Sequence, residues 1–115
     1  MDTQVSTLPR EVIKRSAERA PFDARKIRSA IERAGAATGE FAADEAALLA
    51  AQVGKVLIHR FHGEAPGIEQ IQDVVEQTLI AANHLATARA YIAYRDRHAT
   101  LRADRQTLVH VESSI

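Results

Sequence analysis

The chain has 115 residues, of which 15 are basic and 15 acidic, so its formal net charge is zero, and it contains no cysteine. The length predicts one domain, the missing cysteines exclude disulfides and thiolate metal sites, and the neutral charge argues against nonspecific binding to nucleic acid. No run reaches the roughly 18 apolar residues of a membrane span, and no signal peptide is evident, so we expect a cytoplasmic protein with no membrane partner.

The first elements expected along the chain are a leader and a β-hairpin. Residues 1–9 are polar and end in a proline, so we expect a flexible leader. Residues 12–13 and 20–22 are predicted to form two strands, because apolar residues there flank a polar, basic stretch. Ser16 and Ala17 lie at the turn, which has no glycine to adopt a positive φ easily.

A first helix is predicted directly after the hairpin. Asp23 has the short acceptor side chain of an N-cap. The apolar residues that follow repeat with the spacing of one buried helical face, namely Ile27, Ala30, Ile31 and Ala34. We expect Gly35, which follows this stretch, to end the helix. Hydrophobic residues make up 46% of the chain but aromatic residues only 4%, which predicts close packing between small-faced helices.

Three further helices are predicted from apolar periodicity and stop signals. One spans residues 44 to about 62. The next spans about 67–82 and carries an acidic strip that we interpret as a solvated face, formed by Glu69, Asp73 and Glu76. After a break at 83–84, the fourth becomes basic through Arg95, Arg97, Arg102 and Arg105. We expect one domain over residues 10–102 and a linker or tail toward a missing catalytic region over 103–115.

The basic residues around the hairpin are the candidate functional residues. Lys14 and Arg15 follow the first strand, and Lys26 lies in the first turn of a predicted helix, where the helix dipole also favours an anion. Lysine or arginine contacts to phosphate are charge-assisted hydrogen bonds of about 1.5–3 kcal/mol each. Three such contacts suit a nucleoside triphosphate. The alternative is an ordinary solvated basic face, balanced by Glu11, Glu18 and Asp23.

Four motifs follow one another between about Glu11 and Arg97: V-I-K-R, P-F-D-x-x-K-I-x-x-A-I, I-x-x-I-Q-D-V-V-E and A-R-A-Y-I-x-Y-R. In order and spacing they strongly resemble the ATP-cone family. Such domains are nucleotide-sensing modules, usually at the N-terminus of ribonucleotide reductases and also in a bacterial repressor of reductase genes. The resemblance implies an α+β, mainly α fold, in which a small β-hairpin lid caps a four-helix bundle. The helix count from periodicity agrees with it.

The resemblance also implies a site and a function. ATP or dATP would bind beneath the hairpin as an effector, with Mg2+ bound to its phosphates, so the chain would be a regulatory domain and not an enzyme. Asp23 would read the adenine, and Arg95 or Arg97 would close the site from the fourth helix. The nucleotide-binding residues carried over by position are Val12, Lys14, Arg15, Asp23, Lys26, Gln72, Arg95 and Arg97, with no catalytic or metal-ligating residue among them.

The implied macromolecular partner is the catalytic body of a parent reductase or another copy of the domain. The tail from Thr107 to Ile115 resembles the linker into the catalytic body of an anaerobic, glycyl-radical ribonucleotide reductase. This resemblance would make the chain an allosteric module of such an enzyme.

Two alternative functions make different demands on the sequence. A ligand-free assembly module would dock its basic fourth helix on an acidic partner, and ATP would not raise its melting temperature. A DNA-binding repressor is disfavoured by the neutral charge and by the missing cysteines of a zinc ribbon.

We interpret His59 and His62 as surface or packing residues and not as metal ligands. Tyr91 and Tyr94 are expected to pack against a neighbouring helix.

Overall fold

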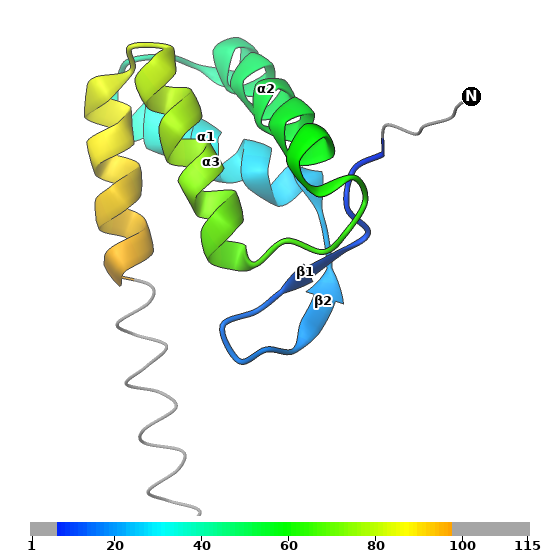
Figure 1. The fold of residues 1–115 in the computed structure, drawn as a ribbon. Helices are drawn as coiled ribbons and strands as arrows, with labels where there is room; N and C mark the ends of the chain where they lie inside the picture. The colour runs from blue at the N-terminus through cyan, green and yellow to red at the C-terminus, as the bar shows by residue number, and fades with distance from the viewer. Residues whose placement is uncertain (1–6, 98–115) are drawn as a thin grey trace, which may run out of the picture.

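The fold is a helical bundle with a small hairpin below one end (Figure 1). The computed structural model describes residues 7–97, and over this part of the chain it contains four helices and two strands. The predicted mainly α class with a hairpin is therefore confirmed. The first six residues of the predicted leader and the whole predicted tail lie outside the described residues. None of the helices within 7–97 combines the length and the apolar character that a membrane crossing requires.

The hairpin consists of β1 (Glu11–Ile13) and β2 (Arg19–Pro21), which pair antiparallel. Its loop is closed by the backbone of Lys14, whose N–H donates to the Glu18 carbonyl at 2.8 Å and whose carbonyl accepts from the Ala17 N–H at 2.9 Å. Ala17 has a positive φ of 73°, a conformation that costs a residue with a Cβ roughly 1–2 kcal/mol. The turn therefore forms without glycine, but with a strained backbone at this alanine.

Helix α1 (Ala24–Thr38) begins as predicted, because the Asp23 carboxylate accepts a hydrogen bond from a first-turn backbone N–H at 3.0 Å. The prediction that Gly35 ends this helix is wrong. The helix ends at Gly39, which adopts the left-handed conformation with φ 76°. Gly35 is buried within the helix, and the ring of Phe41 fills the space that a Cβ would occupy. Gly35 therefore lets the Phe41 ring pack against the helix backbone. The sequence pattern alone does not distinguish such a packing glycine from one that ends a helix.

The other helices lie close to their predicted positions. They are α2 (Ala43–Phe61), α3 (Ile68–Ala81) and a fourth helix over residues 85–97. Asn83 has a positive φ of 66°, which confirms the predicted break between α3 and the fourth helix. The fourth helix, yellow to orange in Figure 1, runs antiparallel beside α3.

The core lies where the helices meet. Helix α1 packs on α2, and α2 packs on α3. The fourth helix contributes Ala88 and Tyr91, and burial raises the pKa of Tyr91 to about 12. Tyr91 therefore stays neutral and packs in the core, as expected. The largest of the fully buried aliphatic side chains are Ile31, Leu49, Leu57, Leu79, Val53, Val74 and Val75.

The loop between α1 and α2 fixes the start of the fourth helix. The carboxylate of Glu40 accepts hydrogen bonds from the Thr87 hydroxyl (2.6 Å), the Thr87 N–H (2.8 Å) and the Ala86 N–H (3.3 Å). The hydroxyl and then the N–H of Thr87 hold the pKa of Glu40 below its ordinary value. Thr87 is fully buried, and its hydroxyl also lies 2.8 Å from that of Thr38. Glu40 therefore satisfies first-turn N–H groups that the fourth helix leaves unpaired.

Candidate functional site

Backbone contacts hold the hairpin next to the N-terminal ends of α1 and α3. On one side, the Ile13 N–H donates to the Pro66 carbonyl at 2.8 Å, and Ile13 forms a parallel bridge with Gly67 just before α3. On the other side, β2 leads into α1, and the Phe22 N–H donates to the Arg10 carbonyl at 2.9 Å. The space between hairpin, α1 and α3 is therefore bordered by three elements, and the hairpin is attached to both helices.

A hollow of about 220 Å3 lies in this space. Isoleucine side chains of α1 and α3 and the Phe22 ring give it an apolar lining. Four of the predicted site residues also line it, namely Val12, Lys14, Asp23 and Lys26. Both lysines are exposed, and no described residue forms a salt bridge with either of them. The structure therefore brings two available cations to an apolar hollow.

Asp23 is the acidic residue that lines this hollow, and its carboxylate is held in the ionised form. Its two carboxylate oxygens accept hydrogen bonds from Nε and Nη2 of Arg25, each at 3.1 Å. These side-chain bonds, followed by the bond from the Arg25 backbone N–H, hold the pKa of Asp23 below its ordinary value. Asp23 is therefore ionised at neutral pH, and an ionised carboxylate accepts hydrogen bonds without donating any.

A second, open hollow of about 550 Å3 continues from the first along α1. The two hollows share Asp23 and Lys26, and the second extends to Arg33 and Tyr94. Lys26 thus lies between an apolar hollow and a solvent-open surface that carries further cations. This arrangement suits a ligand with a flat apolar ring at one end and negative charge at the other.

The hairpin tip is tied to α3 by a predicted site residue. Arg15 forms a salt bridge with the Glu69 carboxylate, and its Nη2 donates to Oε1 of Gln72 at 3.3 Å. Arg15 and Gln72 are therefore together, at the α3 edge of the hollow and outside its lining. Glu69 and Asp73 of the acidic strip are solvent-exposed, as interpreted from the sequence, but Glu76 is half-buried, and all three carboxylates pair with an arginine.

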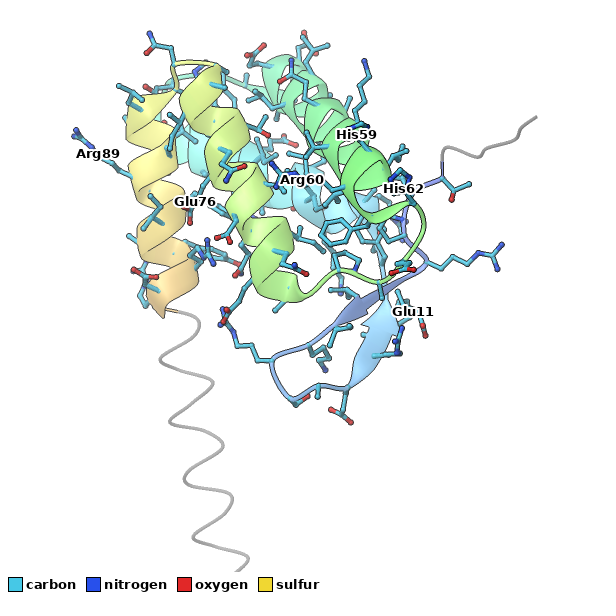
Figure 2. All side chains as sticks on the ribbon, viewed as in Figure 1. Glu11, His59, Arg60, His62, Glu76 and Arg89 are labelled. Atoms are coloured by element: carbon cyan, nitrogen blue, oxygen red, sulfur yellow. The ribbon has the colours of Figure 1, made fainter. Side chains whose placement is uncertain are left out.

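The two candidate arginines of the fourth helix have different surroundings. Arg95 lies 2.9 Å from a carboxylate oxygen of Asp73, also pairs with Glu76, and its side chain is only 14% exposed. Glu76 lies on the side of α3 that faces the fourth helix (Figure 2). Arg97 is exposed and lines a hollow of about 280 Å3 between α1 and the fourth helix, which shares Arg33 and Tyr94 with the second hollow. Neither arginine lines the hollow beneath the hairpin.

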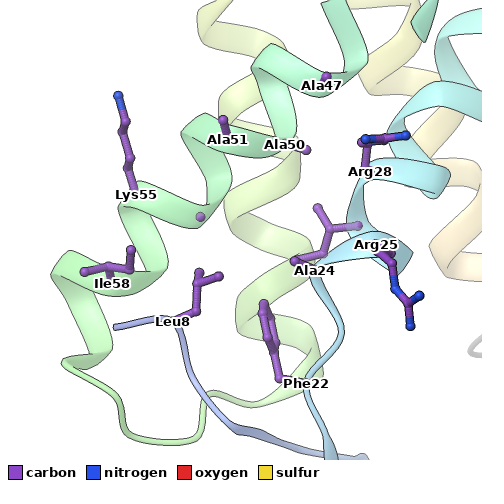
Figure 3. A pocket seen from close by; sticks show the side chains of 12 residues that line it. Leu8, Phe22, Ala24, Arg25, Arg28, Ala47, Ala50, Ala51, Lys55 and Ile58 are labelled. Carbon is purple, nitrogen blue, oxygen red and sulfur yellow. The ribbon is translucent and has the colours of Figure 1, made fainter. Parts of the chain in front are cut away.

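A further hollow, of about 380 Å3, lies between α1 and α2 (Figure 3). Its lining is mainly apolar and includes Leu8 and alanines of α2, with Arg28 and Lys55 as exposed cations. None of the eight predicted site residues lines it. The hollow beneath the hairpin is the stronger candidate, because four of the predicted site residues, including two exposed lysines, line it.

The two histidines near the end of α2 do not make a metal site on their own. His59 and His62 are exposed at the end of α2 (Figure 2), with ring centroids 6.3 Å apart. Within residues 7–97, no group of three or more histidine, aspartate or glutamate side chains is placed to hold a metal ion.

Residues 10–100 match the family described as ATP cone domain. The chain belongs to the ATP-cone family. Among curated relatives, it is 37% identical over 100 residues to the anaerobic ribonucleoside-triphosphate reductase of Haemophilus influenzae, an alignment that covers 84% of this chain and 14% of that protein. The match to this family confirms the resemblance that the four motifs indicate.

Two other relatives are reductases of different types. The chain is 35% identical over 103 residues to the ribonucleoside-diphosphate reductase subunit alpha of Chlamydia muridarum, covering 82% of this chain and 10% of that protein. It is 31% identical over 104 residues to the vitamin B12-dependent ribonucleoside-diphosphate reductase of Thermoplasma acidophilum, covering 86% of this chain and 13% of that protein. The ATP-cone chain thus spans between 10% and 14% of the length of these three relatives.

Proposed function

We propose that this ATP-cone domain is a regulatory nucleotide sensor of a ribonucleotide reductase, with ATP or dATP as its effector and Mg2+ bound to the phosphates. The observation that carries the proposal is the single hollow that gathers four of the predicted site residues, Val12, Lys14, Asp23 and Lys26. Membership of the ATP-cone family and the reductase relatives support it. The domain binds and performs no chemistry itself.

The hollow suits one end of a nucleotide better than a whole one. Its volume of about 220 Å3 is below the roughly 300–1,000 Å3 of pockets that enclose a complete small molecule. The base therefore enters the apolar hollow, and the triphosphate stays outside, near Lys14 and Lys26. In this proposal the Asp23 carboxylate accepts a hydrogen bond from the exocyclic amino group of adenine.

The expected affinity follows from these contacts. Each charge-assisted lysine–phosphate hydrogen bond contributes about 1.5–3 kcal/mol. Two such bonds and burial of the base face must exceed the free-energy cost of association and of ordering the side chains. The sum is compatible with a Kd around micromolar, which corresponds to about −8 kcal/mol.

Titration calorimetry with single alanine variants tests this proposal. Lys14→Ala and Lys26→Ala are each expected to weaken ATP binding about tenfold or more, because each removes a phosphate contact. Arg28→Ala is the matched control, since it removes an exposed cation of α1 that lines the groove of Figure 3 and not the hollow. The proposal is refuted if both lysine variants bind ATP like the parent, or if the control loses as much affinity.

The nucleotide signal is proposed to act on packing between domains. Bound nucleotide would change how the ATP-cone domain contacts the catalytic body of a reductase or a second copy of the domain. ATP differs from dATP only by the ribose 2′-hydroxyl, so discrimination between them must come from contacts to that group. A coupling of about 1–3 kcal/mol between the nucleotide site and the contact surface is enough for control.

A further inference from the structure

We propose that the salt bridge between Arg15 and Glu69 is an electrostatic latch, which competes with the triphosphate for Arg15 and thereby sets the affinity of the site. The inference rests on the proposed function. The latch joins the hairpin tip to α3 along one edge of the hollow, since Lys14 and Ile68, the sequence neighbours of Arg15 and Glu69, both line that hollow. A phosphate bound at Lys14 therefore lies next to a cation that Glu69 already neutralises.

The latch can open without leaving a buried charge. The side chain of Arg15 is 28% exposed and that of Glu69 is 61% exposed, so water can solvate both after they separate. Glu69 also lies in the first turn of α3, where the helix dipole and free N–H groups favour a carboxylate. A triphosphate carries more negative charge than one carboxylate, so it is the stronger partner for Arg15.

Opening the latch requires the Arg15 side chain to turn and leaves β1 in place. The contacts of Ile13 with Pro66 and Gly67 hold β1 next to α3 and do not involve the Arg15 side chain. Arg15 also donates to Gln72 at 3.3 Å, a bond to a neutral acceptor that is weaker than the ionic one. The Arg15 side chain therefore has two alternative partners, either Glu69 or the phosphates.

The variant Glu69→Gln tests the latch, because it removes the charge and keeps the size and the acceptor oxygen of the side chain. It is expected to bind ATP about two- to fivefold more tightly than the parent, the range set by a partly exposed ion pair. Adenosine, which has no phosphate, is expected to bind both proteins equally. Glu64→Gln is the matched control, because Glu64 is an exposed carboxylate before α3 that forms no salt bridge with a described residue.

A second pair of proteins shows whether Glu69 acts through Arg15. In an Arg15→Ala background, Glu69→Gln is expected to give no gain in ATP affinity, since the latch is already absent. A gain that persists there means that Glu69 repels the phosphates directly, which overturns the latch. Calorimetry on all five proteins supplies these comparisons.

The outcomes separate the latch from the proposed function. ATP binding by the parent, with a gain for Glu69→Gln only while Arg15 is present, supports the latch. ATP binding with no gain for Glu69→Gln, or with an equal gain for Glu64→Gln, overturns the latch and leaves the proposed function standing. Absence of ATP binding to the parent refutes the proposed function and the latch together.

Discussion

Replacing Gly35 by alanine is expected to destabilise this ATP-cone domain, although alanine favours a helix. Gly35 is buried within α1, and a Cβ built at this position overlaps three carbon atoms of the Phe41 ring. The ring belongs to the loop after α1 and packs against the core. Because the helix backbone cannot move away without disturbing the core, the ring has to leave its place.

The size of the effect follows from two opposing contributions. Alanine in place of glycine stabilises a helix interior by about 1 kcal/mol. Overpacking of a close contact costs about 1–3 kcal/mol, and overlap with several atoms of a rigid ring places this site near the upper end of that range. The expected net loss in the free energy of unfolding of Gly35→Ala is therefore about 2 kcal/mol.

Gly54→Ala is the matched control, because Gly54 is also inside a helix but its added Cβ meets only Cδ2 of Leu8, at an ordinary distance of 3.5 Å. This variant is expected to gain up to about 1 kcal/mol. Urea unfolding with a common slope measures both changes. The reasoning is refuted if Gly35→Ala is as stable as the parent or more stable. It is also refuted if Gly35→Ala costs as much stability in a Phe41→Ala background as it does in the parent.

Two further predictions concern the attachment of the fourth helix. Arg95→Met leaves the carboxylates of Asp73 and Glu76 without their cation, so the free energy of unfolding should fall by about 1–3 kcal/mol. ATP affinity, measured by calorimetry, should stay unchanged. A variant that keeps full stability but loses ATP affinity would contradict this prediction. The pKa of Glu40 is held below its ordinary value of 4.5, mainly by Thr87. The ionised carboxylate therefore stabilises the fold above about pH 4.5, and this contribution is lost as the pH falls through the lowered pKa. The difference in melting temperature between the parent and Glu40→Gln should therefore be complete at neutral pH and shrink below about pH 4.5; a difference that grows in acid would contradict it.

Much of the fold was predictable from the sequence, because it depends on local pattern. The Asp23 cap, the break at residues 83–84 and the bounds of α2 follow from side chains within a few positions of each feature. The clustering of Lys14 and Lys26 followed from their places at a strand end and in a helix first turn, two segments that a short hairpin keeps adjacent.

The rest depends on contacts between distant segments. Gly35 was predicted as a helix end because its packing partner, Phe41, is identified only once the loop after α1 folds back. The pairing of Arg15 with Glu69 joins residues 54 positions apart, and no periodicity within α3 indicates which carboxylate an arginine of the hairpin will meet. The choice between Arg95 and Arg97 likewise depends on how the fourth helix is rotated against α3.

The most direct test of the central claim is a titration of the isotope-labelled domain with ATP, followed through its backbone amide resonances. The account predicts saturable shifts concentrated in β1, in the hairpin loop, at residues 23–26 and in the first turn of α3, because these segments surround the hollow beneath the hairpin. Shifts confined to the residues around the hollow between α1 and α2, or no saturable shift at millimolar ATP, would contradict it.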